Sequence, residues 1–356
     1  MLEDRLEKVQ ERISSLQLDA FLILNYENIR YLTGFTGSAS AILITQKGSF
    51  FLTDFRYRTQ AEGEVKGFEI KEYKKQKKGI IDHLSSLWLK RVGFESLHIS
   101  YAFFDALKKG LNGVELIPCV NIVEDIRVIK EPSEIEYIKK GGQIIEKVFL
   151  RINDIVKRGL KEKEICAEIG YQLRKGDSEG EPFDLIVTSG ERSALPHGRA
   201  GDKVISDGDL IILDLGAKYM GYNSDITRTV VVGKPHKREE DIYKLVRLAQ
   251  SRAIESISPG IMAKEIDAMT RNIISEGGYG DNFGHGTGHG VGLAVHESPK
   301  IAWDEEVIIE KGMVFTIEPG IYIPGWGGIR IEDMVVVTVD GCEVLTSGIN
   351  REFMVI

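Results

Sequence analysis

The chain has 356 residues, of which 42% are hydrophobic and 28% are charged. This length exceeds what one ordinary core needs, so we expect two domains of a globular protein that folds without disulfide bonds. The net charge of -8 argues against nucleic acid as a partner, because a phosphate-binding surface needs an excess of basic residues.

The first third of the chain alternates helix and strand patterns. Apolar side chains near the N-terminus recur at steps of four, three, four and three residues, which predicts an amphipathic helix rather than a signal peptide. These side chains are Leu2, Leu6, Val9, Ile13 and Leu16. Apolar runs predict strands at 20–24, 40–45, 49–55, 68–73 and 114–120. We interpret residues 1–125 as a small α/β domain.

A linker is predicted at 126–132, followed by a second domain at 133–356. Ser133 and Glu136 fit a capping box, and the helix that they start is expected to reach about residue 159. Another helix is expected from Lys161. Further patterns predict strands at 183–190, 209–216, 226–233, 313–323 and 329–340, and helices at 238–257 and 263–276. Paired helices with long antiparallel strands indicate an α+β domain.

The cysteines and the hydropathy pattern bear on location. Cys119, Cys166 and Cys342 are far apart and form no C-x-x-C pair, which is typical of buried thiols in a reducing compartment. No apolar run approaches the length of a membrane span. We therefore expect a cytoplasmic protein that does not bind membranes.

Two aspartates flank a predicted hairpin. Asp214 ends an apolar strand, and Asp225 precedes the next one. A two-residue turn at Tyr219 and Met220 would place these carboxylates directly opposite each other, with Cβ atoms about 5 Å apart. Like charges in that arrangement repel, which favours a shared cation. The alternative is that one aspartate caps a turn and the other is solvated.

Two glutamates lie in later apolar runs. Glu318 and Glu332 are surrounded by β-branched and apolar residues, where an isolated carboxylate would lose several kcal/mol of hydration and tend to stay protonated. Glu332 could instead pair with Arg330, which lies two residues earlier on the same face of the strand. Asp333 points to the opposite face, and we expect it to have a separate role.

The histidines are concentrated in one glycine-rich segment. The chain has 7 histidines, and three of them, His285, His289 and His296, lie in "GHGTGHGVGLAVHE" at 284–297. If 284–293 is extended, the first two share one face and the glycines occupy the other, where they permit close backbone approach. His296 has the opposite parity and needs a bend to join them. A glycine-rich turn with incidental histidines is the alternative.

Other motif classes are excluded by spacing. The glycines do not follow the dinucleotide-binding pattern G-x-G-x-x-G, H-E-x-x-H is not completed, and no G-x-S-x-G is present. His197 lies on a predicted loop after a strand, where it is either functional or an ordinary polar residue. Four carboxylates and one imidazole suit Mn²⁺ or Co²⁺, with Zn²⁺ as an alternative, and can hold two ions about 3.5–4 Å apart.

Five motifs together resemble the pita-bread metallopeptidases. They span about 193–334 and read, in order, "SALPHG", "LDLGAKYMGYNSDITRT", "GHGTGHGVGLAVHE", "TIEPGIY" and "GIRIEDMV". The family includes methionine aminopeptidase, Xaa-Pro aminopeptidase, Xaa-Pro dipeptidase and the non-metal enzyme creatinase. "YLTGFTGSAS" at 31–40 is similar to the creatinase-type N-terminal domain of the proline-specific members. The resemblance implies a C-terminal pita-bread domain preceded by a smaller α/β domain.

The resemblance also implies a set of site residues. By position, the metal ligands would be Asp214, Asp225, His289, Glu318 and Glu332, with Asp225 and Glu332 bridging two ions. His197, His285 and His296 match additional active-site histidines, and Arg330 matches an arginine that supports the metal site and the substrate. Glu318 would also shuttle a proton to the leaving proline nitrogen.

The implied activity is hydrolysis of the bond before proline by two divalent ions per subunit, Mn²⁺ foremost. We predict first an Xaa-Pro aminopeptidase acting on peptides with proline in second position. An Xaa-Pro dipeptidase is the second prediction, and a non-catalytic binding module of the same fold is the third. The resemblance further implies a homodimer.

Overall fold

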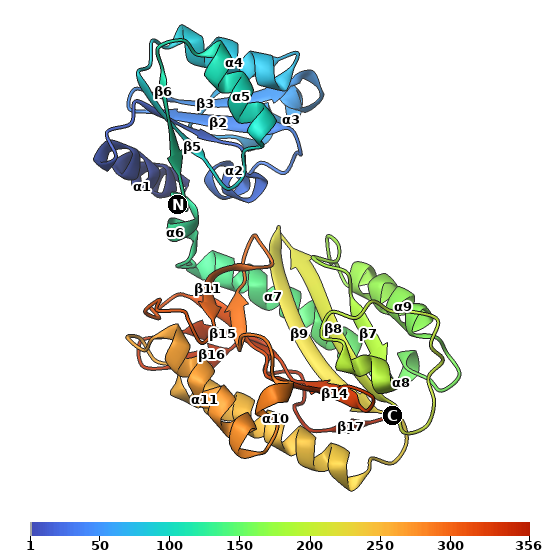
Figure 1. Cartoon of the computed structure of the whole chain (residues 1–356). Coiled ribbons are helices and arrows are strands. Elements are labelled where there is room, and N and C mark those ends of the chain that lie inside the picture. The colour runs from blue at the N-terminus through green and yellow to red at the C-terminus, as the bar shows by residue number, and fades with distance from the viewer. Residues whose placement is uncertain (1) are drawn as a thin grey trace. The chain divides into compact units, whose positions relative to one another are not determined.

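The computed structural model describes residues 2–356 and divides into two compact units between Arg127 and Val128 (Figure 1). The first unit is built on a six-stranded sheet in the order β4-β3-β2-β1-β5-β6. Its elements are α1 (Leu2–Ser15), β1 (Ala20–Ile23), α2 (Tyr26–Thr33), β2 (Ser40–Thr45), β3 (Ser49–Asp54), α3 (Arg58–Glu64), β4 (Glu69–Tyr73), α4 (Gln76–Ser86), β5 (Arg91–Glu95), α5 (Tyr101–Gly110), β6 (Glu115–Cys119) and α6 (Glu124–Arg127).

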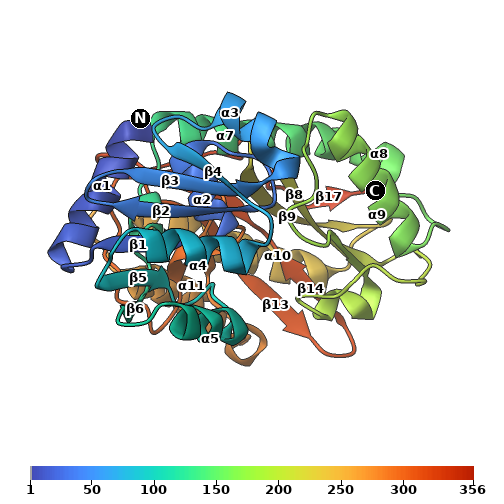
Figure 2. The same cartoon turned by 90° about the horizontal axis from the view of Figure 1, so that it is seen from above.

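This sheet is mixed and is covered by helices. β1, β5 and β6 run parallel, whereas β2 is antiparallel to both of its neighbours (Figure 2). Buried side chains of α4 and α5, such as Leu84 and Leu107, pack against strand residues such as Leu22 and Phe94. The sequence did not predict β5, because its charged ends and Gly93 break the apolar run, although the strand lies between β1 and β6.

The helix after the boundary starts earlier than expected. α7 spans Pro132–Phe149, and its cap lies at Glu131, whose backbone N–H donates to Glu134 Oε2 at 2.9 Å. The predicted capping box at Ser133 and Glu136 is therefore wrong. Proline suits the first helical position because it has no N–H to satisfy and its φ is already helical, and this moves the cap towards the N-terminus. α8 (Ile152–Ile155) and α9 (Glu162–Lys175) follow.

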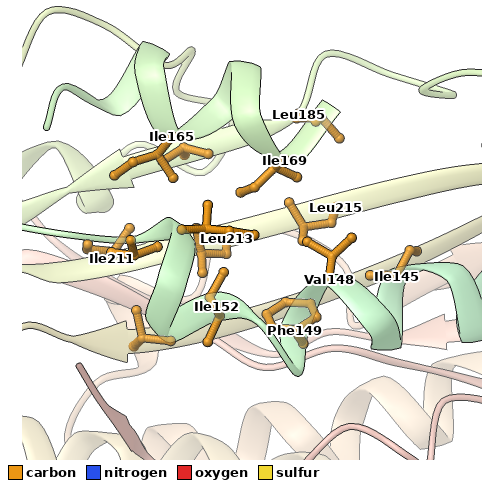
Figure 3. Close-up of a cluster of buried hydrophobic side chains, with 14 of the residues drawn as sticks. Ile145, Val148, Phe149, Ile152, Ile165, Ile169, Leu185, Ile211, Leu213 and Leu215 are labelled. Atoms are coloured by element: carbon orange, nitrogen blue, oxygen red, sulfur yellow. The ribbon is translucent and has the colours of Figure 1, made fainter. Parts of the chain in front are cut away.

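One sheet of the second unit is covered by these helices. Its strands are β7 (Ile186–Ser189), β8 (Leu210–Tyr219), β9 (Tyr222–Val231) and β17 (Met354–Val355), in the order β17-β9-β8-β7. Figure 3 shows side chains of α7 and α9, among them Val148 and Ile169, meeting Leu213 and Leu215 of β8. This core buries one face of the hairpin β8–β9.

The register of that hairpin differs from the prediction. The turn lies at Met220 and Gly221, both with positive φ (50° and 82°), so Asp225 pairs with Gly216, and Asp214 pairs with Thr227. A two-residue hairpin turn of this kind needs the left-handed conformation at both positions, which glycine adopts without strain. The two aspartates are therefore diagonal neighbours on the same face instead of direct partners.

The second half of the unit contains two long helices and the remaining strands. α10 (Lys237–Ser256) and α11 (Ala263–Glu276) pack together and cover a sheet in the order β11-β10-β12-β15-β16. These strands are β10 (Gly288–Gly290), β11 (Glu297–Ile301), β12 (Val314–Ile317), β15 (Asp333–Val337) and β16 (Cys342–Val344). β13 (Gly320–Ile323) and β14 (Gly327–Arg330) form a separate hairpin. The expected combination of paired helices and antiparallel strands is confirmed. Among residues 2–356, no helix has both the length and the apolar surface needed to cross a bilayer.

The glycine-rich segment forms a strand only at β10, where glycine permits the predicted close approach of the backbone. A Cβ atom on Gly288 would lie 1.9 Å from the backbone oxygen of Thr316, whereas one on Gly284 would have no neighbour within 4 Å. We expect Gly288→Ala to lower the free energy of unfolding of the second unit by about 1–3 kcal/mol or more, because backbone strands must separate. Urea unfolding monitored by circular dichroism would measure the change.

Gly284→Ala is the matched control and should alter this free energy by no more than about 0.5 kcal/mol. Equal destabilisation by both substitutions would contradict a steric role specific to position 288.

Candidate metal centre

The candidate residues converge where the four-stranded and the five-stranded sheets of the second unit meet. Asp214 lies on β8 and Asp225 on β9, whereas His289 lies on β10. Glu318 directly follows β12, and Glu332 directly precedes β15. The backbone N–H of Glu332 donates to the carbonyl of Thr227 on β9 at 3.0 Å, which ties the two sheets together at the site.

Three of these residues place ligand atoms within reach of one ion. One ligand atom each of Asp225, His289 and Glu332 lies within 4.8 Å of the other two. His289 Nε2 is 3.3 Å from Glu318 Oε1 and 3.7 Å from Asp225 Oδ2. His289 Nδ1 lies 3.1 Å from the carbonyl of Gly290, which can only accept. Nδ1 therefore carries the hydrogen, and Nε2 presents a lone pair to the centre of the cluster.

The carboxylates carry buried oxygens that have no hydrogen-bond partner among residues 2–356. These atoms are Asp214 Oδ1, Asp225 Oδ1 and Glu332 Oε1. The other Glu332 oxygen accepts from the Thr227 hydroxyl at 2.6 Å. Buried polar atoms are almost always paired, so three buried carboxylates that each leave one oxygen unpaired indicate a site for a cation. Carboxylate oxygens with one imidazole are a donor set suited to Mn²⁺, Co²⁺ or Zn²⁺.

The electrostatics of the cluster agree with this interpretation. Burial, followed by the charge of Glu332, raises the pKa of Asp225 well above its ordinary range. Burial and the charges of Glu318 and Asp214 raise the pKa of Glu332 in the same way, and burial raises the pKa of Glu318. Burial lowers the pKa of His289, which favours the neutral ring that a metal requires. Without cations the protein would compensate by binding protons.

Arg330 pairs with Asp214, whereas the sequence had left open a pair with Glu332. Its Nη2 donates to Asp214 Oδ2 at 2.6 Å, and the structure shows no hydrogen bond or ion pair from its side chain to Glu332. The guanidinium is 3% exposed and also donates through Nε to the Thr227 hydroxyl at 3.1 Å and through Nη1 to the Pro196 carbonyl at 3.1 Å. Arg330 thereby orients one acid of the cluster and leaves Glu332 available to a cation.

Tyr322 connects Arg330 to His285 and was not predicted from the sequence. Arg330 Nη1 donates to the Tyr322 hydroxyl at 2.8 Å, and that hydroxyl lies 2.9 Å from His285 Nε2. His285 Nδ1 lies 2.7 Å from the carbonyl of Gly286, so Nδ1 is the donor and Nε2 accepts from the phenol. Burial raises the pKa of Tyr322 to about 12, which keeps the phenol protonated. Its role depends on the register of β13 and β14, which local patterns do not reveal.

The remaining histidines lie at the exposed side of the cluster. The His296 ring is exposed, and its centroid is 4.4 Å from that of His289, so the bend required by its parity is present. His197 is exposed on the loop after the short 3-10 helix Gly190–Ala194. Its charge is a lesser cause than burial in lowering the pKa of His285 and of His296. Both residues are accessible from solvent.

Asp333 has the separate role expected of it. Its carboxylate accepts from Arg228 Nη2 at 2.8 Å and from Arg351 Nε at 2.8 Å, and both Arg228 and Asp333 have fully buried side chains. Arg228 also donates to the backbone carbonyl of Glu332. The sequence did not predict this ion pair. Through Arg228 it fixes the backbone of Glu332, a candidate ligand.

Known proteins match this chain along its whole length. The model of Metallopeptidase family M24 matches residues 136–339, and that of the Creatinase/Prolidase N-terminal domain matches residues 5–129. An Xaa-Pro dipeptidase of Pyrococcus horikoshii is 40% identical over 97% of each chain. The structure of an Xaa-Pro dipeptidase from Bacillus anthracis has a TM-score of 0.97 at 40% identity and covers 100% of both chains. That of an X-Pro aminopeptidase from Thermotoga maritima has a TM-score of 0.91 at 40% identity over 99% of each chain.

Proposed function

Because the chain belongs to metallopeptidase family M24, in its proline-specific branch, we propose that it is an Xaa-Pro dipeptidase. Xaa-Pro aminopeptidase is the first prediction from the sequence. Relatives and solved structures named Xaa-Pro dipeptidase or prolidase favour the second prediction. The X-Pro aminopeptidase from Thermotoga maritima, which is equally similar in sequence, supports aminopeptidase as the other candidate.

The observation that carries a metal-dependent function is the cluster of Asp225, His289 and Glu332, whose ligand atoms lie within 4.8 Å of one another beside buried carboxylate oxygens that have no hydrogen-bond partner among residues 2–356. We propose that Asp214, Asp225, His289, Glu318 and Glu332 hold two divalent ions, Mn²⁺ foremost, with Co²⁺ or Zn²⁺ as alternatives. Such ions supply a Lewis acid and lower the pKa of water towards neutrality.

The protein's own groups would orient and protonate the substrate. Glu318, with its raised pKa, is suited to carry a proton to the leaving proline nitrogen. Tyr322 holds His285 as a neutral ring whose Nε2 is occupied, so His285 positions the site. His296 and His197 are exposed and can donate hydrogen bonds to a peptide arriving from solvent. Arg330 keeps Asp214 in place.

Peptide length decides between the two activities. We expect the purified protein with Mn²⁺ or Co²⁺ to hydrolyse Ala-Pro, with kcat/KM at least tenfold above that for Ala-Pro-Gly. The product alanine would be measured by chromatography. Ala-Gly, which lacks proline, is the matched control and should be hydrolysed far more slowly.

Efficient release of alanine from Ala-Pro-Gly, with little from Ala-Pro, would identify an aminopeptidase instead. Metal binding without hydrolysis of any of these peptides would identify a non-catalytic binding module.

We also propose a location and an oligomeric state. A cytoplasmic location is supported by the three cysteines, all of which are free thiols. A homodimer is supported by the resemblance to the pita-bread family, and sedimentation velocity of the full chain would measure its mass.

A further inference from the structure

Residues 283–287, which include His285, are anchored by an ion pair on the neighbouring helix α11, in which the carboxylate is buried and the arginine side chain is 25% exposed. Asp267 of α11 has a fully buried side chain, and both of its carboxylate oxygens accept from Arg271 at 2.9 Å. Asp267 Oδ1 also accepts from the Thr287 backbone N–H at 3.1 Å and from the Thr287 hydroxyl at 2.9 Å. Burying the Asp267 carboxylate costs free energy of solvation. An exposed Asp–Arg pair with the same spacing would stabilise α11 equally well.

The partner arginine holds the same segment at two other points. Arg271 donates to the carbonyl of Phe283 through Nη1 and to the carbonyl of His285 through Nη2, each at 2.9 Å. Its guanidinium lies 4.5 Å from the ring centroid of Phe283 and 5.1 Å from that of Trp303. Asp267 and Arg271 together therefore contact residues 283, 285 and 287 of the chain.

These anchor points lie next to the residues of the site. The Thr287 carbonyl accepts from the backbone N–H of Glu318 at 2.7 Å. Two residues further on, the His289 N–H donates to the Thr316 hydroxyl at 3.0 Å, and the same hydroxyl donates to Glu318 Oε1 at 3.2 Å. A shift of Thr287 would therefore move Glu318. A shift of the backbone at His285 would likewise move its ring relative to Tyr322.

The glycines explain why such anchoring is needed. Glycine occupies positions 284, 286, 288 and 290, and glycine loses more conformational freedom on ordering than any other residue. β10 covers only Gly288–Gly290, so strand pairing does not order the preceding part of the segment. Side-chain contacts from α11 supply the missing constraint.

We propose that Asp267 and Arg271 are positioning residues for the peptidase reaction: they act through Phe283, His285 and Thr287 to place His285, His289 and Glu318. This inference rests on the proposed function only for its kinetic part. Neither residue is one of the candidate metal ligands. Their spacing on α11 is the sequence signal that could have drawn attention to them.

Arg271→Lys tests the proposal in the full-length protein. Lysine retains the positive charge beside Asp267 but cannot also reach both carbonyls in the geometry of a guanidinium. We expect kcat for Ala-Pro to fall 10–100-fold while KM changes less than about threefold. We expect Co²⁺ affinity, measured by calorimetry, to fall by a similar factor, with an altered visible absorption spectrum of bound Co²⁺. Asp241→Asn, which breaks an exposed ion pair with Lys237 on α10, is the control and should change none of these quantities.

Thr287→Val provides the second arm, because it removes one hydrogen bond to Asp267 and leaves the ion pair intact. It should produce the same changes in smaller degree, and Thr287→Ser, which restores the hydroxyl, should reverse them. Lower thermal stability with unchanged Co²⁺ affinity, spectrum and kcat would overturn the proposal, since Asp267 and Arg271 would then be only structural. If the wild-type protein hydrolyses no Xaa-Pro peptide, the proposed function fails, and the Co²⁺ measurements still decide the role of the ion pair.

Discussion

Glu332→Gln is expected to slow hydrolysis of Ala-Pro severely and, at the same time, to make the metal-free protein more stable. Glu332 is 2% exposed, with one oxygen held by Thr227 and the other unpaired. Glutamine keeps the shape and can still accept from Thr227, but it removes the negative charge. Losing a ligand charge should weaken metal binding, and the loss of several kcal/mol of transition-state stabilisation corresponds to a decrease in kcat/KM of about 10³-fold.

The opposite effect on stability follows from the same geometry. In the absence of cations, Asp225 and Glu332 are buried together; burial and then the charge of Glu332 raise the pKa of Asp225, and burial and then the charges of Glu318 and Asp214 raise the pKa of Glu332. Removing one of these charges relieves repulsion that no counter-ion balances. Differential scanning calorimetry in chelator should therefore show a higher Tm for the variant than for the wild type, and calorimetric titration with Mn²⁺ should show weaker binding.

Glu343→Gln is the matched control, because it makes the same chemical change at an exposed position of β16 in the same unit. It should leave activity, metal affinity and metal-free stability close to wild type. A Glu332→Gln protein that binds Mn²⁺ normally would exclude Glu332 from the metal site.

The stability of the metal-free protein is expected to fall as the pH rises, and added Mn²⁺ should reverse this trend. Asp225, Glu318 and Glu332 all have raised pKa values in the folded state. Between their ordinary values near about 4 and their raised values, the folded protein holds more protons than the unfolded chain. Stability is then fully present at low pH and is lost as the pH increases through the raised values.

Divalent cations compete with these protons and bind the deprotonated site. At an ion concentration of about 100 times Kd, binding adds about 2.7 kcal/mol, or about 5–10 °C in Tm for a unit of this size. The increase in Tm on adding Mn²⁺ should be larger at pH 8 than at pH 5. Equal increases at both pH values, or a metal-free protein that is most stable at pH 8, would contradict a buried carboxylate cluster. Glu332→Gln should show a weaker pH dependence than the wild type.

Local patterns were sufficient to predict most helices and strands and to nominate the residues of the site. Apolar alternation marks which face of a strand is buried, and this can be identified within a few residues of sequence. A carboxylate in such a run needs a partner wherever the run is buried, so Asp225 and Glu332 were visible as candidates before their neighbours were known. The glycines around His289 likewise indicated close backbone approach, which is observed at Gly288.

The partners of these residues depended on tertiary structure. Arg330 could not be assigned to Asp214 from the sequence, because the two are separated by 116 positions, and a nearer acid, Glu332, was available. The hairpin register depended on positive φ at Met220 and Gly221, and β5 depended on burial between two other strands. Tyr322 and the Asp267–Arg271 pair entered the site only through contacts between distant segments. Short-range sequence determines which side chains must be buried or charged, whereas the choice among possible partners is made by the packing energy of the whole unit.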